Sequence, residues 1–451
     1  MAERLHVDAS NLALFTDLYE LSMLQAYQAS GMSGTATFSL YFRKLPPVRR
    51  FMLACGQQHA AHLAASLRFE RSALDQLATL PGFRDDFLRW LEDFRFSGDI
   101  VAMPEGTPVF ANEPLLEVTA PIAEAQLLES LLMNLVHLET VLASKAVRVV
   151  LAAGRRPVMD FGMRRMHGTD AALHGVRAFQ VAGLDGSSNV LAALMFNVPA
   201  QGTMAHSFIQ AHGDETQAFR EYAALYPGTT LLVDTWDTID AVEKIIALHR
   251  EMGDEFNIGA IRIDSGDFAA LAREARMRLD AAGLKQVKIV ASGGLDEYQI
   301  ARLVEEGAPI DAFGVGTAMG TSADAPYLDL VYKLTLYDGE PRIKDSPGKP
   351  VLPGAKQVYR YRDDEGHILR DEITLRDEMR EAKPLLVPIV RQGEALAAAT
   401  LDPRLAALYA RGEIERLPAS VRSLEEGDAG FSVQVSEALK RLHAEALARA
   451  H

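Results

Sequence analysis

The second half of the chain alternates between short apolar runs and longer segments with helical spacing. The apolar runs are "TTLLVD", "IGAIRID", "VKIVAS" and "IDAFGVG", and segments with apolar residues three or four positions apart separate them. They end near residues 233, 263, 291 and 315, which places the ends 24 to 30 residues apart. This spacing predicts strand–helix units around a parallel sheet.

Three weaker strand signals precede this region: "RPVMDFG", "GLDGSSNV" and "NVPAQGTMAH". Together the signals give seven candidate strands between about residues 157 and 316. An irregular α/β barrel fits this number of parallel strands best, and an open doubly wound sheet is the alternative.

The two ends of the chain have a different pattern. Strand-like and helical segments are mixed over residues 1–125, a Pro/Gly/Lys-rich link follows residue 340, and a helical tail begins near residue 433. We expect 126–338 to form the barrel, and 1–125 and 339–451 to build a second, mixed α+β domain together.

Composition limits the classes of function. The chain of 451 residues has a formal net charge of −15, which argues against general binding to nucleic acids or anionic membranes. Its single cysteine, Cys55, excludes an intrachain disulfide and a cysteine-based zinc site. The start, "MAERLHVDAS", lacks the apolar core of a signal peptide, and the long apolar segment after residue 124 is interrupted by charges. We therefore expect a cytoplasmic protein.

Nearly every candidate strand ends in charged, hydroxyl-bearing or glycine residues. In a barrel these positions share the carboxyl edge of the sheet, where active sites lie. The residues are Asp160, Phe161, Gly162, Arg164, Arg165, Gly186, Ser187, Ser188, Gly202, Thr203, His206, Asp234, Asp237, Arg262, Asp264, Ser265, Asp267, Ser292, Gly293, Gly294, Gly314, Gly316 and Thr317.

This edge has the composition of an anion-binding site. The glycine-rich "ASGG" and "GVGTAMGT" expose backbone N–H groups, although ordinary turns also favour glycine. Arg164, Arg165 and Arg262 add guanidinium groups suited to phosphate or carboxylate. The aspartates in "DTWDT" and "DSGD" are candidates either to hold Mg²⁺ on a polyphosphate or to cap the helices that follow.

His206 and His212 are six residues apart, which does not match the spacing of a metal-binding pair on one helix face. His206 follows a Gly-Thr strand exit and is the functional candidate. The pattern leaves open a metal ligand, a general base, a phosphate acceptor or a structural residue. His212 is the better candidate for a structural role.

These motifs carry a family resemblance. "FTDLYELSMLQAY", "EPLLEVTAPIAEAQLLES", "DFGMRR", "GLDGSSNV", "GTMAHSFIQAH", "LLVDTWDT", "IRIDSGDF", "FGVGTAMGTSADAP" and "LPGAKQVYR" resemble nicotinate phosphoribosyltransferases in order, from about residue 11 to 362. The resemblance implies a type II phosphoribosyltransferase barrel. It also implies a homodimer whose active sites are shared between subunits, with nicotinate, phosphoribosyl pyrophosphate (PRPP) and ATP as small-molecule substrates and with Mg²⁺.

The implied reaction converts nicotinate, PRPP, ATP and water to nicotinate mononucleotide, diphosphate, ADP and phosphate through a phosphohistidine. It is the first step from nicotinate to NAD, carried out by an ATP-coupled, ligase-type enzyme. By this resemblance, His206 is the phosphate acceptor and Asp234 orients it, while Asp264 contacts ribose or Mg²⁺.

Further roles follow by position in the motifs. Tyr19, from the partner subunit, and Phe161 would sandwich the pyridine ring, with Ser188 and Arg165 also at nicotinate. The residues implied for PRPP and its phosphates are Arg43 (also from the partner), Arg164, Arg262, Gly293, Gly294, Gly316 and Thr317.

Ser188 bears on the choice of substrate. Relatives that use nicotinamide carry an aspartate at this place, which accepts from an amide but repels a carboxylate, so serine favours nicotinate. Met166 and His167 depart from the Ala-Gln expected in many members, which leaves the role of His167 open.

Three other functions remain as alternatives. The first is a type II phosphoribosyltransferase that uses nicotinamide or quinolinate, and the second is a non-catalytic regulator that binds a metabolite. The third is a phosphate-binding barrel enzyme such as an aldolase, an isomerase or a flavin enzyme. These usually place a catalytic lysine or a pair of bases at strand ends, and no lysine stands at a predicted strand end here. The nearest lysine, Lys145, lies in the helix before the barrel.

Overall fold

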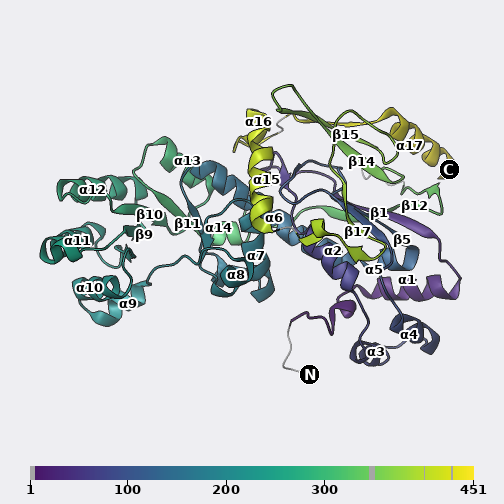
Figure 1. Ribbon diagram of the computed structural model, residues 1–451, viewed down its shortest axis with the longest axis horizontal. Helices are drawn as coiled ribbons and strands as arrows, with labels where there is room; N and C mark the ends of the chain where they lie inside the picture. The colour runs from purple at the N-terminus through teal and green to yellow at the C-terminus, as the bar shows by residue number, and fades with distance from the viewer. Residues whose placement is uncertain (1–5, 345–350, 401, 428–429, 451) are drawn as a thin grey trace. The chain divides into compact units, whose positions relative to one another are not determined.

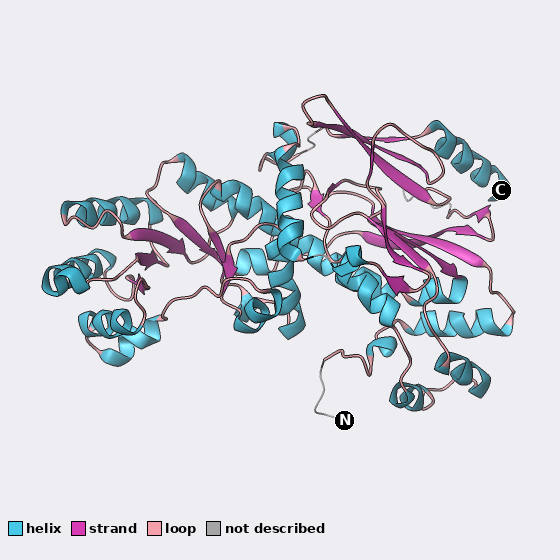
Figure 2. Ribbon diagram, viewed as in Figure 1, coloured by secondary structure: helices cyan, strands magenta, loops and turns pink. Residues whose placement is uncertain are grey.

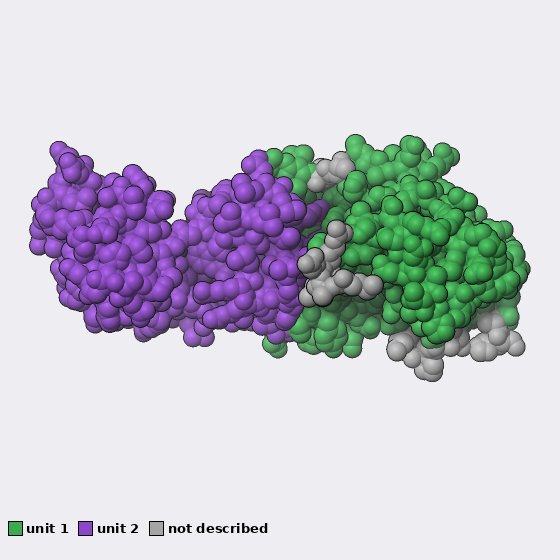
Figure 3. Space-filling model, turned by 90° about the horizontal axis from the view of Figure 1, so that it is seen from below, with its two compact units in different colours: residues 1–144, 325–451 green, residues 145–324 purple. Residues whose placement is uncertain are grey.

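The chain divides into two compact units, coloured separately in Figure 3. Unit 1 comprises residues 1–144 and 325–451, and unit 2 comprises residues 145–324. The computed structural model describes residues 6–344, 351–400, 402–427 and 430–450.

The unit boundaries differ from the expected 125/126 and 338/339 for two reasons. Helix α6 (Glu129–Ala153) begins among the core residues of unit 1, where Leu132 and Val136 are buried. Strand β12 (Leu330–Tyr337) pairs antiparallel with β1 (Thr35–Phe42) in the main sheet of unit 1. The first division therefore falls inside α6, and the second precedes β12.

Unit 2 is built on six parallel strands in the order β7-β6-β11-β10-β9-β8. Their bounds are β6 (Val158–Asp160), β7 (Gly186–Ser187), β8 (Thr230–Leu232), β9 (Ala260–Ile263), β10 (Lys288–Ser292) and β11 (Ala312–Val315). Within the described part of the chain, β7 and β8 are the two edges of this curled sheet. The expected irregular α/β barrel is confirmed, and it is a half-barrel rather than a closed one.

The seventh strand expected within 198–206 is wrong. Ala200 makes one isolated bridge to Ser187, and helix α9 (His206–His212) begins only six residues later. Ser187 donates to the Pro199 carbonyl (3.1 Å) and accepts from the Gln201 N–H (2.9 Å). Because Pro199 has no N–H, the ladder cannot extend further towards the start of this segment.

Helices cover the half-barrel (Figure 2). In Figure 1, α10, α11 and α12 follow one another along the outside of β9 and β10; α11 packs against both neighbours, and α12 against these strands. The remaining bounds are α7 (Thr169–Val181), α8 (Val190–Phe196), α10 (Glu215–Leu225), α11 (Thr238–Met252), α12 (Phe268–Ala281), α13 (Glu297–Glu305) and α14 (Thr317–Gly320). Because both faces of the sheet are buried, Ile261, Ile289 and Phe313 have no exposed surface.

Unit 1 is mixed α+β and draws on both ends of the chain, as expected. Its seven-stranded sheet has the order β13-β12-β1-β5-β3-β17-β18, a four-stranded sheet has the order β16-β14-β15-β19, and β2 pairs with β4. The remaining strands are β2 (Met52–Leu53), β3 (Asp99–Ala102), β4 (Pro108–Val109), β5 (Leu116–Pro121), β13 (Glu340–Pro341), β14 (Lys356–Arg362), β15 (Ile368–Leu375), β16 (Lys383–Pro384), β17 (Val387–Arg391), β18 (Glu394–Ala395) and β19 (Ser432–Val435).

The helices of unit 1 pack on these sheets, with α5 against β1 and β5 and α2 against β17. They are α1 (Leu18–Ala29), α2 (Gln57–Ser66), α3 (Arg71–Leu77), α4 (Asp85–Glu92), α5 (Ile122–Leu127), α15 (Pro403–Glu415), α16 (Ala419–Arg422) and α17 (Glu437–Ala450). The expected helical tail thus starts at 437, because residues 432–435 pair in parallel with β15. Among the described residues, no helix has the length and apolar character needed to cross a membrane.

Candidate active site

The carboxyl edge of the unit 2 sheet gathers the residues that the sequence analysis placed after strands. Asp160, Ser187 and Ser292 end their strands, and Phe161, Ser188, Asp264, Gly293 and Gly316 come directly after a strand. Asp234 follows β8 by two residues, and His206 and Thr317 open the short helices α9 and α14. Parallel strands present these positions on one edge, which is why residues far apart in sequence meet there.

Asp160 organises the junction between β6 and β7. Its carboxylate is fully buried and accepts hydrogen bonds from Ser187 Oγ (2.7 Å) and the N–H of Gly162 (2.8 Å). Burial raises the pKa of Asp160, while these hydrogen bonds lower it. The Asp160 carbonyl accepts from the N–H of Ser188 at 2.9 Å. Among the described residues the Ser188 hydroxyl has no hydrogen-bond partner, so it is available to a ligand.

Phe161 offers an aromatic face beside a cation. Its N–H donates to the carbonyl of Val315 at 2.8 Å, which fixes the start of the loop to β11. The Arg262 guanidinium lies 5.9 Å from the centre of the ring. A side chain at Gly314 would lie 2.4 Å from the same ring, so the glycine gives Phe161 its place against the strand.

Arg262 is a half-buried cation on β9 with unused hydrogen-bonding capacity. Burial lowers its pKa, whereas the nearby Asp264 and Asp234 raise it. One terminal nitrogen donates to the carbonyl of Met204 at 3.3 Å, and the buried Nε has no partner in the described chain. A buried donor of this kind can be satisfied by an anionic ligand or by a water molecule.

The two pairs of aspartates have separate roles. Asp237 caps α11 by accepting from the N–H of Asp240 (2.8 Å), and Asp267 caps α12 by accepting from the N–H of Ala270 (3.0 Å). The capping alternative is therefore confirmed for one aspartate in each segment.

Asp234 and Asp264 face the edge instead. Asp234 Oδ2 accepts from Ser265 Oγ, and Asp264 Oδ1 accepts from Ser292 Oγ, each at 2.5 Å. The other oxygen of Asp234, Oδ1, is buried and lacks a partner in the described chain.

The two glycine-rich loops approach the neighbouring strands closely. Gly293 has φ +93°, and a Cβ there would lie 1.8 Å from the carbonyl oxygen of Asp264. Only glycine fits this position. In the second loop Thr317 Oγ1 accepts from the Arg165 guanidinium at 3.0 Å, which joins a predicted nicotinate residue to a predicted phosphate residue.

His206 lies at the first residue of α9, and its contact differs from the one expected. Its Nδ1 is 3.1 Å from Thr235 Oγ1, whereas Asp234, the expected partner, is turned to Ser265. His212 contacts the carbonyl of Phe208 (2.8 Å) and Glu221 (3.0 Å), which agrees with a structural role.

Tyr19 and Arg43 precede the residues described above in the sequence and belong to unit 1 rather than unit 2. Tyr19 is 46% exposed near the start of α1. Arg43, which follows β1, forms an ion pair with Asp329 at 3.1 Å. All the other predicted site residues belong to unit 2, whereas Tyr19 and Arg43 belong to unit 1.

Comparison with known proteins now gives the family. The model of the nicotinate phosphoribosyltransferase N-terminal domain matches residues 14–137, and that of the nicotinate phosphoribosyltransferase family matches residues 157–380. A Mycobacterium tuberculosis protein, nicotinate phosphoribosyltransferase pncB2, is 49% identical over 97% of this chain and 93% of its own. The chain belongs to the nicotinate phosphoribosyltransferase family.

Other members agree. The Bacillus subtilis nicotinate phosphoribosyltransferase is 39% identical over 82% of this chain and 77% of its own. The crystal structure of human nicotinic acid phosphoribosyltransferase matches with a TM-score of 0.81 at 27% identity, covering 95% of this chain and 99% of that one.

Two further residues of this nicotinate phosphoribosyltransferase family member bear on the sequence predictions. Lys145 is buried in ion pairs with Glu297 and with Asp324 (2.8 Å), so the lysine-dependent alternative has no support at this position. Thr235, the contact of His206, was missed by sequence reasoning. It lies between two aspartates in "DTWDT", and nothing in that pattern distinguishes its hydroxyl from that of Thr238.

Proposed function

We propose that this protein joins nicotinate to PRPP, releasing pyrophosphate, and couples the step to ATP hydrolysis through a phosphohistidine at His206. The observation that carries the proposal is the carboxyl edge of unit 2. There Phe161 lies beside the half-buried Arg262, whose Nε lacks a partner in the described chain, next to two glycine loops. A flat aromatic acid and a phosphorylated sugar match these groups.

In the transfer step the bond between ribose C1 and the pyrophosphate oxygen breaks, and the leaving oxygen takes the electron pair. The ring nitrogen of nicotinate supplies the pair for the new bond to C1. Arg262 and Arg164 stabilise the negative charge on pyrophosphate, and Phe161 supports the ring as it becomes a pyridinium. The protein thus acts chiefly by positioning and by electrostatics.

In the coupled step a histidine nitrogen attacks the γ-phosphorus of ATP, ADP leaves, and water later hydrolyses the phosphohistidine. The Thr235 contact supports Nε2 as the attacking atom. When Nδ1 carries the proton and donates to Thr235, Nε2 keeps its lone pair free.

Mg²⁺ fits the residues present. Asp234 has an unpartnered buried oxygen and Asp264 lies near Arg262, and carboxylate oxygens combined with substrate phosphates are ligands that Mg²⁺ prefers. Asp264, with Asp234 beside it, would hold the ion. When bound, the ion would neutralise charge on the phosphates.

The proposal includes a homodimer in which Tyr19 and Arg43 complete the partner's site. Tyr19 is 46% exposed, and Arg43, besides its ion pair with Asp329, has a buried Nε without a partner in the described chain. Stacking by Tyr19 on the free face of the nicotinate ring would complete the sandwich with Phe161.

The direct test is a turnover assay with nicotinate, PRPP and Mg²⁺, with and without ATP, reading mononucleotide and ADP. We expect mononucleotide to form, ATP to increase the amount formed, and ADP to be released. Radiolabel from γ-labelled ATP should enter the wild type and not His206→Ala. Product from nicotinamide or quinolinate but not from nicotinate would overturn the substrate assignment, and label in His206→Ala would overturn the phosphohistidine.

Ser188 gives a prediction for specificity. Ser188→Asp should raise the KM for nicotinate by about 100-fold, because it brings a carboxylate against the substrate's own carboxylate. Ser188→Asn, which adds a similar volume without charge, is the matched control and should cost less. Equal KM values for Ser188→Asp and the wild type would contradict the assignment.

A further inference from the structure

A second basic site lies at the opposite, amino edge of the unit 2 sheet. A cavity of about 500 Å³ opens there, and none of its lining residues belongs to the catalytic edge. The lining residues come from three connections that precede strands: Arg155 and Arg156 before β6, residues 285–288 at the start of β10, and residues 308–311 before β11. Arg276 of α12 completes the lining.

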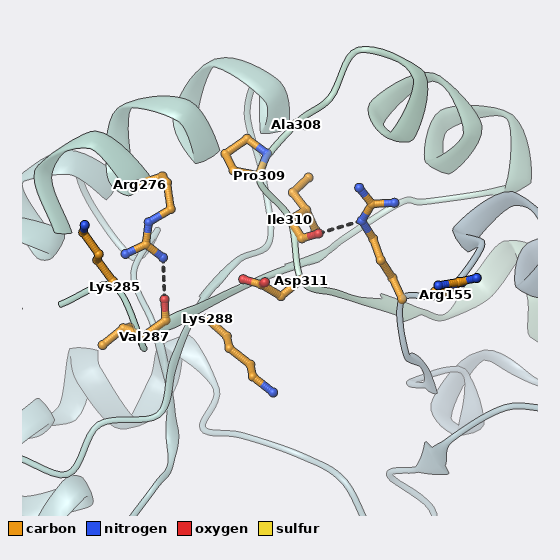
Figure 4. Close-up of a pocket in the computed structure, with 10 residues that line it drawn as sticks. Arg155, Arg276, Lys285, Val287, Lys288, Ala308, Pro309, Ile310 and Asp311 are labelled. Atoms are coloured by element: carbon orange, nitrogen blue, oxygen red, sulfur yellow. Dashed lines mark hydrogen bonds between the residues drawn. The ribbon is translucent and has the colours of Figure 1, made fainter. Parts of the chain in front are cut away.

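The lining is strongly cationic in an acidic protein. It contains five basic side chains (those of Arg155, Arg156, Arg276, Lys285 and Lys288) and one acidic side chain, that of Asp311, within a chain of net charge −15. In Figure 4, Lys285 and Arg276 lie on one side of Asp311 and Arg155 lies on the other. The local charge is thus opposite in sign to that of the molecule as a whole.

Two of the arginines are held in place by the backbone. Arg276 donates to the carbonyls of Val287 (2.6 Å) and Leu284 (2.8 Å), and its Nε donates to Asp280 (2.8 Å). Arg156 Nε donates to the carbonyl of Ile310 at 2.8 Å. Each guanidinium keeps N–H groups that have no acceptor in the described chain. Because the side chains are already ordered, binding an anion costs little further entropy.

The other three cations, Arg155, Lys285 and Lys288, are exposed and have no ion-pair partner among the described residues.

Stabilisation of helix ends explains only part of this cluster of cations. Arg155 and Arg156 follow the last turn of α6, where cations are favourable. Lys288, however, is the first residue of β10, and Lys285 lies beyond the end of α12.

We propose that this cavity binds a small polyanion carrying two or more linked phosphate groups. Arg156 and Arg276 would supply fixed guanidinium donors. The exposed side chains of Arg155, Lys285 and Lys288 would close over the ligand and add positive charge. The volume lies within the range of small-molecule sites and admits a nucleoside polyphosphate as well as an inorganic chain. The proposal does not depend on the function of the carboxyl edge.

The test uses inorganic tripolyphosphate as the probe and hydrogen–deuterium exchange of the full-length protein as the readout. The exchange pattern distinguishes the two edges, since the catalytic edge is also expected to bind phosphates. We expect tripolyphosphate to slow exchange in segments 285–289 and 308–312. Lys285→Gln combined with Lys288→Gln should raise the half-saturating concentration of tripolyphosphate for that protection about tenfold or more. Protection at 292–294 and 314–317 should stay unchanged.

Arg250→Gln combined with Arg441→Gln is the matched control. It removes two exposed cations that no ion pair engages in the described chain, and it should leave the half-saturating concentration unaltered. Protection confined to the catalytic-edge segments, or equal protection by sodium chloride at the same ionic strength, would overturn the proposal. Stronger protection by oligo-aspartate than by tripolyphosphate would also overturn it and would indicate a docking surface for acidic proteins.

ATP and tripolyphosphate, compared at equal free concentration, separate the two sources of the phosphate chain. Tighter protection of the same segments by ATP would assign the cavity to nucleotides. Equal protection would assign it to the polyphosphate alone. Both results support the site. If neither ATP nor tripolyphosphate protects these segments, the proposal is contradicted.

Discussion

At the scale of single residues, the structure changes the expected partner of His206. An aspartate just after a strand is an obvious candidate to orient a histidine, yet the 3.1 Å contact to His206 is made by Thr235. Asp234 instead accepts from Ser265. The sequence identified the histidine from the Gly202-Thr203 pair that precedes it, although the strand expected there does not form. It could not identify its partner, since that depends on the rotamers of consecutive side chains after β8.

This contact leads to a prediction about ATP coupling. Thr235→Val, nearly isosteric, removes the hydroxyl and should lower the ATP-dependent stimulation of turnover about five- to tenfold, the effect of one lost hydrogen bond. Turnover without ATP should not change. The measurement is the ratio of mononucleotide formed with and without ATP, and Thr235→Ser should preserve it. A ratio in Thr235→Val equal to that of the wild type would show that the hydroxyl does not position His206.

At the scale of elements, strands were easier to predict than irregular segments. Six of the seven candidate strands in unit 2 exist. Four of them, β8 to β11, were predicted from the apolar runs that buried parallel strands produce, whereas β6 and β7 were predicted from weaker signals. The seventh prediction, within 198–206, rested on a short segment that contains Pro199. The loops after β10 and β11 were also identified from sequence. Their close contacts, such as that of Gly293 with the Asp264 carbonyl, depend on how neighbouring strands are aligned.

The loop after β10 allows a matched comparison of two adjacent glycines. Gly293→Ala should lower stability by more than about 3 kcal/mol, since its Cβ would lie 1.8 Å from a backbone oxygen at φ +93°. Gly294→Ala has φ +68° and open space, so we expect about 1–2 kcal/mol. Urea unfolding of both variants measures the difference. Similar losses would mean that the close approach to Asp264 is not a constraint.

Helix α1 carries a carboxyl group that should make stability depend on pH. Glu20 is buried and accepts from Ser130 Oγ (2.7 Å) and from the Ser130 N–H (3.1 Å) at the start of α6. Burial raises the pKa of Glu20 to about 7, although the hydrogen bonds from Thr16 and Ser130 lower it. The folded state therefore holds this proton more tightly than the unfolded state does.

The sign follows from that difference in proton binding. Between the unfolded pKa of about 4.3 and the folded value of about 7, stability should fall as pH rises, and above that range this contribution should level off. Glu20→Gln, which stays neutral, should flatten the decline. Urea midpoints at pH 5 and pH 8 for both proteins provide the measurement. An equal decline in Glu20→Gln would assign the pH dependence to other groups, such as Glu129.

At the scale of the whole molecule, the division into two units was only partly visible in the sequence. The contribution of both chain ends to one domain was predicted correctly from their shared α+β pattern. The first boundary was not, because α6 is apolar along most of its length, and an apolar pattern does not tell which core a helix enters. Likewise, β12 follows the last strand of the half-barrel closely, although its partner lies near the other end of the chain.

The proposed dimer can be tested on an exposed apolar face of unit 2. Helix α8 begins two residues after Ser188 and leaves Leu191 56% and Leu194 77% exposed, with Val190 and Met195 similar. Leu194→Lys should raise the dimer dissociation constant about 100-fold or more, because it would bury a charge at an apolar contact. Light scattering coupled to size exclusion measures the mass. Met277→Lys, on the exposed side of α12, is the control, and a Leu194→Lys protein that remains dimeric would exclude this face.

The pairing of β1 with β12 has a consequence for synthesis on the ribosome. Unit 2 is contiguous in sequence, so all of its residues are available once residue 324 has left the ribosome. Strand β1, in contrast, must wait for a partner made about 290 residues later, roughly 15–60 s at typical bacterial and eukaryotic translation rates. During that time one edge of β1 is open to pairing with other nascent chains. Ribosome-stalled chains ending before residue 330 should therefore bind chaperones more strongly than chains that include β12, and equal binding would contradict this order of assembly.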